Sequence, residues 1–419
     1  MKDTVNVFWF RRDLRLDDNV GFYNALKSEH PVLPIFIFDE EILKKLPKDD
    51  ARITFIYETL QKMRSKLEDK NNSSIAVFHG EPATIYKNLL EKYNIDTVFT
   101  NRDYEPYAKD RDDKIQQLLN DNNIKFKTFK DQVIFEQNEV TKKDGLPYVV
   151  YTPYMKVWKE QFKTHTLDFY YTSSFLKNLI QDKELPNLSL SDIGFTKSNQ
   201  KIKKHIVTPA LIQNYEDTRN FPAQDSTSKL GPHLRFGTVS IRKMIEKAIT
   251  EKNEIFWQEL IWREFFMQIL WHFPHTSKNS FKAKYDRIDW RNNEAEFLKW
   301  CNGQTGYPLV DAGMRQLNET GFMHNRIRML VGSFLCKHLL IDWRWGEAYF
   351  AEKLHDYEMA SNIGNWQWVA GSGVDAAPYF RIFNPTTQIK KFDNDLAYIK
   401  KWVPDFQEFT YPKEMVDHK

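Results

Sequence analysis

One stretch of the sequence places a carboxyl group and a guanidinium group among aromatic rings. Glu259, Trp262, Arg263 and Phe266 are spaced three and four residues apart, so they lie on one face if the stretch is helical. Taken alone, the stretch is explained better by an i,i+4 ion pair between Glu259 and Arg263 beside packed rings.

A set of tryptophans lies close to polar residues. Asn362 and Trp366 are four residues apart, so they share a face if this segment is helical, and Trp368 follows. Burial in the core explains most single tryptophans. The set that also includes Trp290 and Trp343 has many polar and charged neighbours, whereas an ordinary core would use leucine and isoleucine. Tryptophan is easily oxidised, so a chain of tryptophans can relay electrons.

A third candidate site could hold phosphate. The segment Thr227-Ser-Lys-Leu-Gly231-Pro232 offers two hydroxyl groups and several backbone N–H groups at an expected helix start. Such groups can bind phosphate oxygens. The commoner use of such a segment is as a helix N-cap or a turn.

Basic residues could form a surface that binds nucleic acid. The candidates in the second half of the chain are Arg219, Arg326, Arg328, Arg381, Lys390 and Lys391. Bases stack on tryptophan while arginine holds phosphates. The formal net charge is only +3 and the isoelectric point is about 8.4, which permits a nucleic-acid partner without requiring one. A solvated charged face is the ordinary alternative.

Several common sites are excluded by the sequence. Cys301 and Cys336 are the only cysteines, which excludes a disulfide framework and any four-cysteine zinc or iron–sulfur site. The 11 histidines show no metal-ligand spacing, and no Walker A, H-E-x-x-H or G-x-S-x-G motif occurs. Gly371-Ser-Gly373-Val-Asp-Ala376 matches the glycine pattern of dinucleotide sites, but it follows a helical segment and no strand.

Composition indicates a globular chain. It has 419 residues, of which 28% are charged, and its mean hydropathy is −0.61. No apolar run is long enough to span a bilayer, and the first residues lack the pattern of a signal peptide. We therefore expect a cytoplasmic monomer without contact to a membrane.

The elements that must position these residues follow from hydrophobic periodicity. Short apolar runs at 5–10, 32–38, 75–78 and 97–99 alternate with helical segments such as 54–67 and 82–93. This alternation predicts βαβ units on a parallel, doubly wound sheet, so we place an α/β domain at 1–130. Prolines and polar clusters then predict a connector at 131–204, with one helix at 154–162.

From 205 to 419 the periodicity predicts an all-α domain, and ten of the 12 tryptophans lie between Trp257 and Trp402. The segment 325–339 shows an apolar face at three- and four-residue steps. The stripe beside this face holds Asn325, Arg328, Met329 and Gly332. Its glycine would let another body approach the helix closely, at a cost in helix propensity.

Long motifs in a fixed order make the sequence recognisable. They are Thr227-Ser-Lys-Leu230, Glu259-Leu-Ile-Trp-Arg-Glu-Phe265, Thr305-Gly-Tyr-Pro308, Met323-His-Asn-Arg326, Trp366-Gln-Trp368 and Asp375-Ala-Ala-Pro-Tyr-Phe-Arg381. With them, the sequence resembles the photolyase/cryptochrome family, and most closely the bacterial class I cyclobutane pyrimidine dimer photolyases. The resemblance runs from Val7 to about Trp402 and is strongest from Tyr215 to Phe392.

The resemblance implies an α/β antenna domain followed by an all-helical domain that binds FAD, fully reduced in the active protein. It assigns FAD contacts to Tyr215, Thr227, Ser228, Lys229, Leu230, Gly231, Phe256, Glu259, Arg263, Arg328, Asp356, Tyr357, Glu358 and Asn362. Asn362 is implied to face the flavin nitrogen that gains a proton on reduction. A second antenna chromophore, a folate or a deazaflavin, is also implied, although Tyr107-Ala108 replaces the Asn-Glu pair of folate-binding members.

The remaining roles come from the same resemblance. It implies an electron relay through Trp366, Trp343 and Trp290, with Glu259 and Asn362 in the active site. It implies a lesion pocket that comprises Trp262, Trp368, Asn325 and Met329. It implies DNA contacts by Arg219, Arg326, Arg381 and Gln388.

These roles imply a light-dependent lyase that splits cyclobutane pyrimidine dimers in DNA. One alternative is a cryptochrome, which shares the fold and FAD but signals in place of repairing. Another is a photolyase for 6-4 photoproducts, whose catalytic histidines lie along the segment that here reads His324 to Met329. Asn325 and Met329 argue against the latter, whereas His324 leaves it open. An aromatic-rich DNA-binding module would need no flavin.

Overall fold

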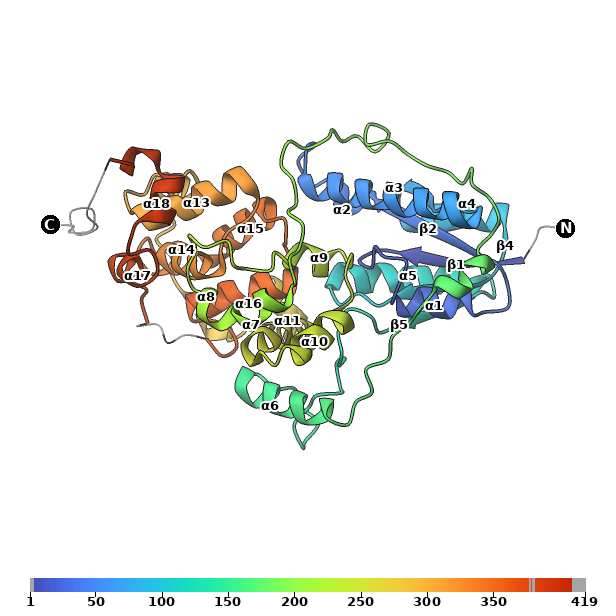
Figure 1. Cartoon of the computed structure of the whole chain (residues 1–419), viewed down its shortest axis with the longest axis horizontal. Helices are drawn as coiled ribbons and strands as arrows, with labels where there is room; N and C mark the ends of the chain where they lie inside the picture. Colours follow the sequence, from blue (N-terminus) through green and yellow to red (C-terminus); the bar gives the residue numbers. More distant parts are fainter. Residues whose placement is uncertain (1–3, 377, 379–380, 409–419) are drawn as a thin grey trace. The chain divides into compact units, whose positions relative to one another are not determined.

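The computed structural model describes residues 4–376, 378 and 381–408, and the chain divides into two compact units (Figure 1). Unit 1 comprises the chain up to residue 136 together with 162–202 and 231–246, and unit 2 comprises the rest. The segment predicted as a connector, 131–204, is therefore shared between the units. The domain boundaries placed at 130 and 204 stay a prediction. Residues 377, 379 and 380 of the last family motif lie outside the described residues.

Unit 1 is built on the predicted parallel sheet. Its strand order is β3-β2-β1-β4-β5, and every pairing is parallel. The strands are β1 (Thr4–Phe10), β2 (Val32–Asp39), β3 (Ala76–Gly80), β4 (Asn94–Asn101) and β5 (Lys125–Phe129). The order reverses beside β1, which is the doubly wound arrangement that the sequence predicted. The sequence prediction missed β5, because lysines alternate with its apolar residues at the sheet edge.

Both faces of the sheet are covered by helices because the side chains of each strand alternate. Phe8 and Phe36 belong to one buried cluster with residues of α1 and α3, whereas Val7 and Ile35 belong to the cluster that includes residues of α4 and α5. The helices and the 3-10 turn of this unit are α1 (Val20–Leu26), α2 (Glu40–Leu43), α3 (Ala51–Asn71), α4 (Pro82–Lys92), α5 (Pro106–Asp121), η1 (Ser173–Asn178), α9 (Gly231–Arg235) and most of α10 (Ile241–Thr250).

Within unit 1 a buried ion network ties the start of α10 to the sheet. The Arg242 guanidinium donates to Asp18 at 3.1 Å and to Asp131 at 2.9 Å, and Arg15 donates to both oxygens of Asp131 at 2.7 Å. Asp131 is 2% exposed. Burial pushes the pKa of Asp131 upward, but Arg15 and Arg242 outweigh it, so the pKa lies below its ordinary value.

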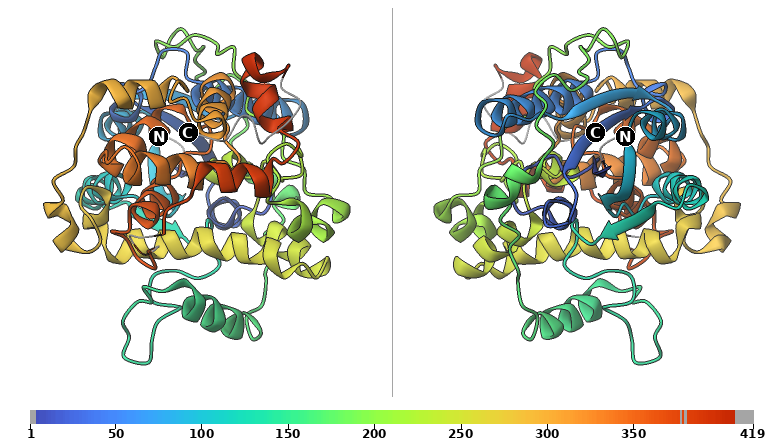
Figure 2. Two further views of the ribbon diagram at one scale, coloured as in Figure 1. Left: turned by 90° about the vertical axis from the view of Figure 1, so that its left-hand side faces the viewer. Right: turned by 90° about the vertical axis from the view of Figure 1, so that its right-hand side faces the viewer.

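Unit 2 is helical, as predicted for the second half of the chain. Its helices and 3-10 turns are α6 (Tyr151–Phe162), α7 (Pro209–Gln213), α8 (Tyr215–Thr218), α11 (Glu254–His272), η2 (Pro274–Ser277), η3 (Ala283–Arg287), α12 (Glu294–Cys301), α13 (Pro308–Thr320), α14 (Asn325–Lys337), α15 (Trp343–Lys353), α16 (Met359–Ala370), α17 (Pro385–Phe392), α18 (Ala397–Trp402) and η4 (Pro404–Phe406). Figure 2 shows α11 as the long yellow helix. Of the helices in the described ranges, none is long and apolar enough to cross a membrane.

Two helix predictions are confirmed closely. The periodic segment 325–339 forms α14, which begins at Asn325 because the His324 ring caps it by accepting from the Arg326 N–H. Ile327, Val331 and Leu335 are fully buried on its apolar face. The aromatic segment predicted at 154–162 forms α6, which starts three residues earlier.

The buried network of unit 1 yields a stability prediction. Asp131→Asn leaves two buried guanidinium groups facing one carboxylate fewer, so we expect a loss of about 3–5 kcal/mol in the free energy of unfolding at pH 7. Because the pKa of Asp131 is depressed in the folded state, its stabilisation is complete above the unfolded pKa, near 4, and is lost as the pH falls through the folded value.

Urea unfolding of wild type and variant at pH 7 and pH 3 measures both effects. Asp17→Asn is the matched control, because the Asp17–Lys243 pair is 46% and 37% exposed and should contribute about 0–1 kcal/mol. Equal losses for the two variants at pH 7 would contradict the assignment of the network.

Candidate functional site

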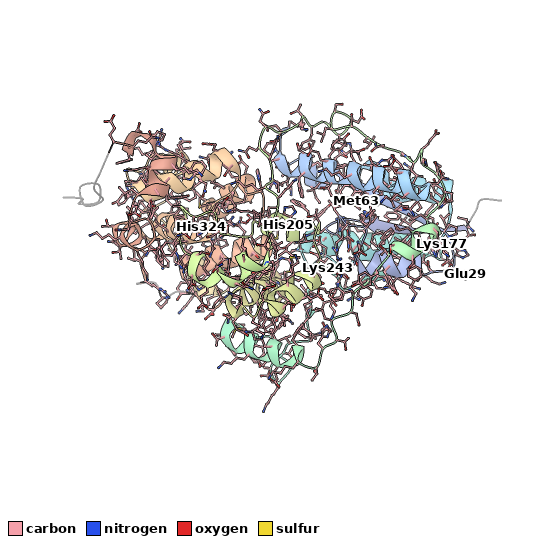
Figure 3. All side chains as sticks on the ribbon, viewed as in Figure 1. Glu29, Met63, Lys177, His205, Lys243 and His324 are labelled. Carbon is pink, nitrogen blue, oxygen red and sulfur yellow. The ribbon has the colours of Figure 1, made fainter. Side chains whose placement is uncertain are left out.

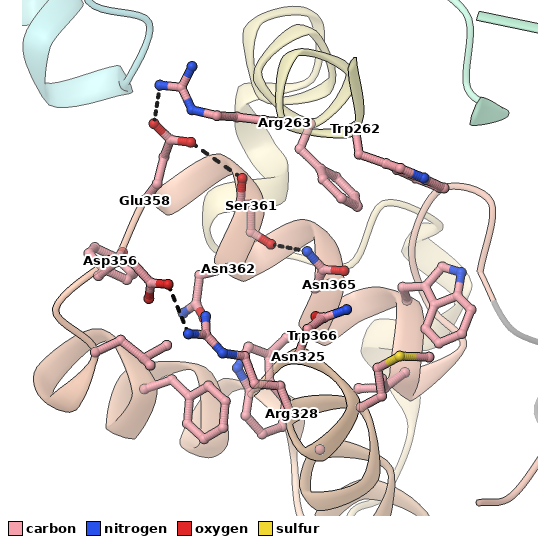
Figure 4. A pocket seen from close by; sticks show the side chains of 18 of the residues that line it. Trp262, Arg263, Asn325, Arg328, Asp356, Glu358, Ser361, Asn362, Asn365 and Trp366 are labelled. Carbon is pink, nitrogen blue, oxygen red and sulfur yellow. Dashed lines mark hydrogen bonds and ion pairs between the residues drawn. The ribbon is translucent and has the colours of Figure 1, made fainter. Parts of the chain in front are cut away.

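A cavity of about 370 Å³ opens in unit 2 between α11, α14 and α16 (Figure 4). Thirteen of the residues predicted for the site line it: Arg219, Glu259, Trp262, Arg263, Asn325, Arg328, Met329, Asp356, Tyr357, Glu358, Asn362, Trp366 and Trp368. The α14 stripe predicted from the sequence faces this cavity along its whole length, because Gly332 lines it as well. A Cβ at residue 332 would lie 3.2 Å from Val369 Cγ2, so the close approach predicted for this glycine is observed.

The carboxylates before α16 form one side of the cavity and are held by arginines from two other helices. Arg328 of α14 donates to Asp356 at 2.8 Å, and Arg263 of α11 donates to Glu358 at 2.8 Å (Figure 4). The second oxygen of Asp356 is buried and has no protein partner. A buried carboxylate oxygen without a partner is costly, so a bound ligand with an N–H or O–H group would satisfy it.

The ion pair predicted between Glu259 and Arg263 is wrong. Glu259 accepts from Arg219 at 2.5 Å, while the guanidinium of Arg263 lies against Glu358. Helical spacing allowed the i,i+4 pair, but unit 2 brings a second arginine and a second carboxylate to α11 from distant parts of the chain. Glu259 thus meets a cation from a distant part of the chain at the cavity wall.

Asn362 is oriented by a residue that the sequence interpretation missed. Its amide donates to the Glu347 carboxylate at 2.9 Å and to the Glu347 carbonyl at 3.2 Å. Both donors are therefore used on α15, and the amide oxygen is left to accept a hydrogen bond from a bound group. Burial raises the pKa of Glu347. No sequence signal marks Glu347, because its contact with Asn362 joins two helices.

Trp366 is fixed by close helix packing. It is 3% exposed, and its ring lies 5.0 Å from Phe350 and 6.2 Å from Trp300, centroid to centroid. A side chain at Gly346 of α15 would collide with this ring. Trp343, also predicted for the relay, is 2% exposed, whereas Trp290 is only partly buried against the same core cluster. The three tryptophans thus belong to one cluster whose outer member approaches the surface.

Other predicted residues lie outside the cavity lining. The Tyr215 ring meets Phe256 edge-on at 5.2 Å. In the predicted phosphate segment, which runs from Thr227 through Ser228, Lys229 and Leu230 to Gly231, Lys229 donates to the Thr227 hydroxyl at 2.8 Å and pairs with Asp225 at 2.7 Å. Helix α9 begins at Gly231, as expected for this segment, but it is only five residues long.

The predicted DNA contacts are spread around the cavity. Arg219 lines it, while Arg326 donates to Asn220 and stacks over Phe392 at 4.4 Å. Burial, followed by the charges of Arg219 and Arg381, lowers the pKa of Arg326, so the three guanidinium groups are close enough to repel one another. Gln388 lies on α17 and is partly buried.

His324 is a structural residue in this fold (Figure 3). Its ring is 2% exposed, and Nδ1 accepts the N–H that starts α14. Burial, with Lys229 and three arginines nearby, lowers the pKa of His324 to about 3. The imidazole is therefore neutral at physiological pH.

Several lining residues were not predicted. Ser361 and Asn365 precede Trp368 by seven and three residues on α16, so helical periodicity counted back from Trp368 would have found them. Phe350 and Leu354 gave no signal, because apolar residues of this kind fill any core.

The residues of the cavity fit a flavin. Trp366, Phe350 and Val369 supply apolar wall, Asn362 offers an acceptor, and Asp356 offers a buried oxygen without a partner. A flat ring system with polar N–H and hydroxyl groups at its edge would satisfy each of these. Within the described residues no group of histidine, cysteine or carboxylate side chains could hold a metal ion.

Comparison with known protein families gives two matches. Residues 6–170 match the DNA photolyase family, and residues 256–419 match the FAD binding domain of DNA photolyase. A deoxyribodipyrimidine photo-lyase of Agrobacterium fabrum is 37% identical over 431 residues, which cover 97% of this chain and 88% of that protein.

Two solved structures share the fold of the whole chain. A bacterial class III photolyase from Agrobacterium tumefaciens superposes with a TM-score of 0.86 at 33% identity, covering 99% of this chain and 89% of that one. An archaeal photolyase from Sulfolobus tokodaii with two FAD molecules gives a TM-score of 0.81 at 34% identity, covering 98% and 92%.

The packing around Trp366 can be tested by adding one methyl group. Alanine in place of a helical glycine ordinarily stabilises a helix, but at residue 346 the new methyl collides with the Trp366 ring, so Gly346→Ala should lose about 1–3 kcal/mol of unfolding free energy. Urea unfolding measures the loss. In Trp366→Phe, which lacks the colliding part of the ring, the same alanine should cost clearly less. A stabilising Gly346→Ala would show that the ring is not held there.

Proposed function

This chain belongs to the DNA photolyase family and carries its FAD-binding domain, and we propose that it splits cyclobutane pyrimidine dimers in DNA when illuminated. The observation that carries the proposal is the cavity of unit 2, which joins a flavin-compatible inner wall to two tryptophans, Trp262 and Trp368. Bound FAD in its reduced form supplies, on excitation by blue or near-ultraviolet light, an electron that opens the cyclobutane ring and then returns.

Residues of α8, α11, α14 and α16, together with the segment 227–231 and the segment before α16, would hold the cofactor. We assign its flavin end to Arg263, Arg328, Asp356, Glu358 and Asn362, whose hydrogen bonds leave one carboxylate oxygen and one amide oxygen free to accept. An acceptor at Asn362 favours a protonated flavin nitrogen, and therefore the reduced cofactor. Tyr215, Phe256, Glu259, Tyr357 and the segment 227–231 complete the proposed FAD site.

A flipped lesion would enter through the side of the cavity that Trp262, Trp368, Asn325 and Met329 line. Tryptophan rings offer flat surfaces on which bases stack, and Asn325 offers both a donor and an acceptor. Glu259, held by Arg219, would hydrogen-bond the pyrimidine edge from the adjoining wall.

Positive charge at the cavity suits the DNA backbone. Burial, and then repulsion of Arg326 by Arg219 and Arg381, lowers the pKa of Arg326. Phosphates placed among them would relieve that repulsion, so DNA affinity should fall with increasing salt. We assign Gln388 to the same contact surface.

Trp366, Trp343 and Trp290 are proposed to pass electrons inward from the surface when the cofactor must be reduced. The Trp366 and Trp343 rings are both buried, whereas the Trp290 ring is only partly buried. This relay prepares the resting cofactor and takes no part in the repair cycle.

His324 supports dimer repair over repair of 6-4 photoproducts. A neutral ring that is 2% exposed and used as a helix cap is poorly placed to exchange protons with a lesion. The Sulfolobus tokodaii relative, described as holding two FAD molecules with implications for a light-harvesting cofactor, supports a second chromophore in this chain too. The chemical identity of this second chromophore, the monomeric state of the protein and its cytoplasmic location stay predictions.

An illuminated repair assay on defined DNA tests the proposal. Oligonucleotides that carry either a cyclobutane dimer or a 6-4 photoproduct are mixed with flavin-loaded, chemically reduced protein, in light and in darkness. We expect loss of the cyclobutane dimer in light only, and no loss of the 6-4 photoproduct. Repair of the 6-4 lesion, or light-driven flavin changes without any repair, would contradict the proposed activity.

A further inference from the structure

A tyrosine outside the predicted site lies flat against the tryptophan of the proposed lesion pocket. The rings of Tyr151 and Trp262 are 3.5 Å apart, centroid to centroid, with an angle of 8° between their planes. Tyr151 is the first residue of α6, and Trp262, labelled in Figure 4, projects from α11 beside the cavity. From the sequence, we predicted α6 only as a helix within a connector.

Tyr151 is itself held from several sides. Its backbone N–H donates to Asp375 at 3.2 Å, and its hydroxyl donates to the Gln258 carbonyl of α11 at 2.9 Å. The side chain is 5% exposed and also meets Phe265 edge-on at 5.8 Å. A ring fixed at its backbone, its face and its hydroxyl end has little freedom of its own, so it can act as a rigid backing.

The rest of α6 reinforces this contact. Tyr154 and Trp158, one and two turns further on, dock on α11: the Trp158 N–H donates to the buried Glu264 at 2.5 Å, and the Tyr154 ring packs 5.3 Å from Phe265. Positions i, i+3 and i+7 of α6 therefore face α11 together. Neither Tyr154 nor Trp158 lines the cavity, whereas Trp262 does.

Trp262 needs such a support because it is only partly buried. A tryptophan at the edge of a cavity can rotate between side-chain conformers, and each rotation would remove the flat surface on which a flipped base stacks. The stack with Tyr151 restricts that rotation before DNA arrives, so less ordering is left to be done on binding.

We propose that Tyr151 is a positioning residue for lesion recognition, which holds Trp262 in the orientation that accepts a flipped pyrimidine dimer. The proposal rests on the proposed function, because it takes Trp262 as part of the lesion pocket. It concerns discrimination between damaged and undamaged DNA, since the Tyr151 ring stacks on Trp262, which would contact the flipped lesion.

The test compares the affinity for DNA with one cyclobutane dimer with the affinity for the same DNA undamaged. Tyr151→Leu should lower the ratio of these affinities by about threefold to tenfold, which is the range of an aromatic stacking contact. Affinity for undamaged DNA and the content of bound FAD should stay unchanged. Tyr151→Phe keeps the ring and loses only the bond to Gln258, so it should restore most of the ratio.

Tyr154→Leu is the matched control, because it removes an aromatic ring from the same helix and the same interface without touching Trp262. It should lower thermal stability and leave the ratio at the wild-type value. If Tyr151→Leu does not fold, Tyr151→Met, whose unbranched side chain adapts to irregular packing without a ring, takes its place. A wild-type ratio in Tyr151→Leu, or in Tyr151→Met where it replaces it, or an equal drop in Tyr154→Leu, would overturn the proposal. A wild-type protein without preference for damaged DNA would instead overturn the proposed function.

Discussion

The geometry of the cavity depends on how closely other helices approach α16. A side chain at Gly364 would collide with Phe266 of α11, and one at Gly346 of α15 would collide with Trp366. The backbone of α16 therefore lies against its neighbours with no space for adjustment. Asn362 and Trp366 lie one turn apart on this helix and gain their positions from that packing. The positions of these two site residues therefore depend on the contacts of α16 with α11 and α15.

Electrostatics divides the site into a balanced part and an unbalanced part. At the inner side, Asp356 and Glu358 each face an arginine, so charge is nearly compensated and the remaining free acceptors can select a neutral ring with donors at its edge. Around Arg326 the charges of Arg219 and Arg381 add to its own, and among the described residues Glu259 is the carboxylate that pairs with Arg219. An inner wall with compensated charge suits a neutral flavin ring, and an outer part with more positive charge suits a polyanion.

Periodicity predicted the parts of the fold whose side chains repeat, and it failed where contacts join distant segments. Strands such as β1 and the stripe on α14 follow from local spacing, and both are confirmed. The pairing of Glu259 with Arg219 could not be predicted, because 40 residues separate them and the nearer Arg263 satisfied every local rule. Glu347 and Tyr151 were missed for the same reason: each acts on another helix. Most residues that line the cavity were predicted from the family motifs, which identify site residues without giving the contacts that position them.

The central claim is that the cavity between α11, α14 and α16 binds FAD through the unpartnered oxygen of Asp356. Bound FAD, released from purified protein and measured by fluorescence, tests it directly in wild type, Asp356→Ala and Asp286→Ala. The control breaks an arginine–aspartate pair outside the cavity, Asp286–Arg344 at 2.6 Å, whose carboxylate is more exposed than that of Asp356. The account predicts that wild type and control keep FAD while Asp356→Ala, still folded by circular dichroism, loses most of it. A folded Asp356→Ala with wild-type FAD content would contradict it.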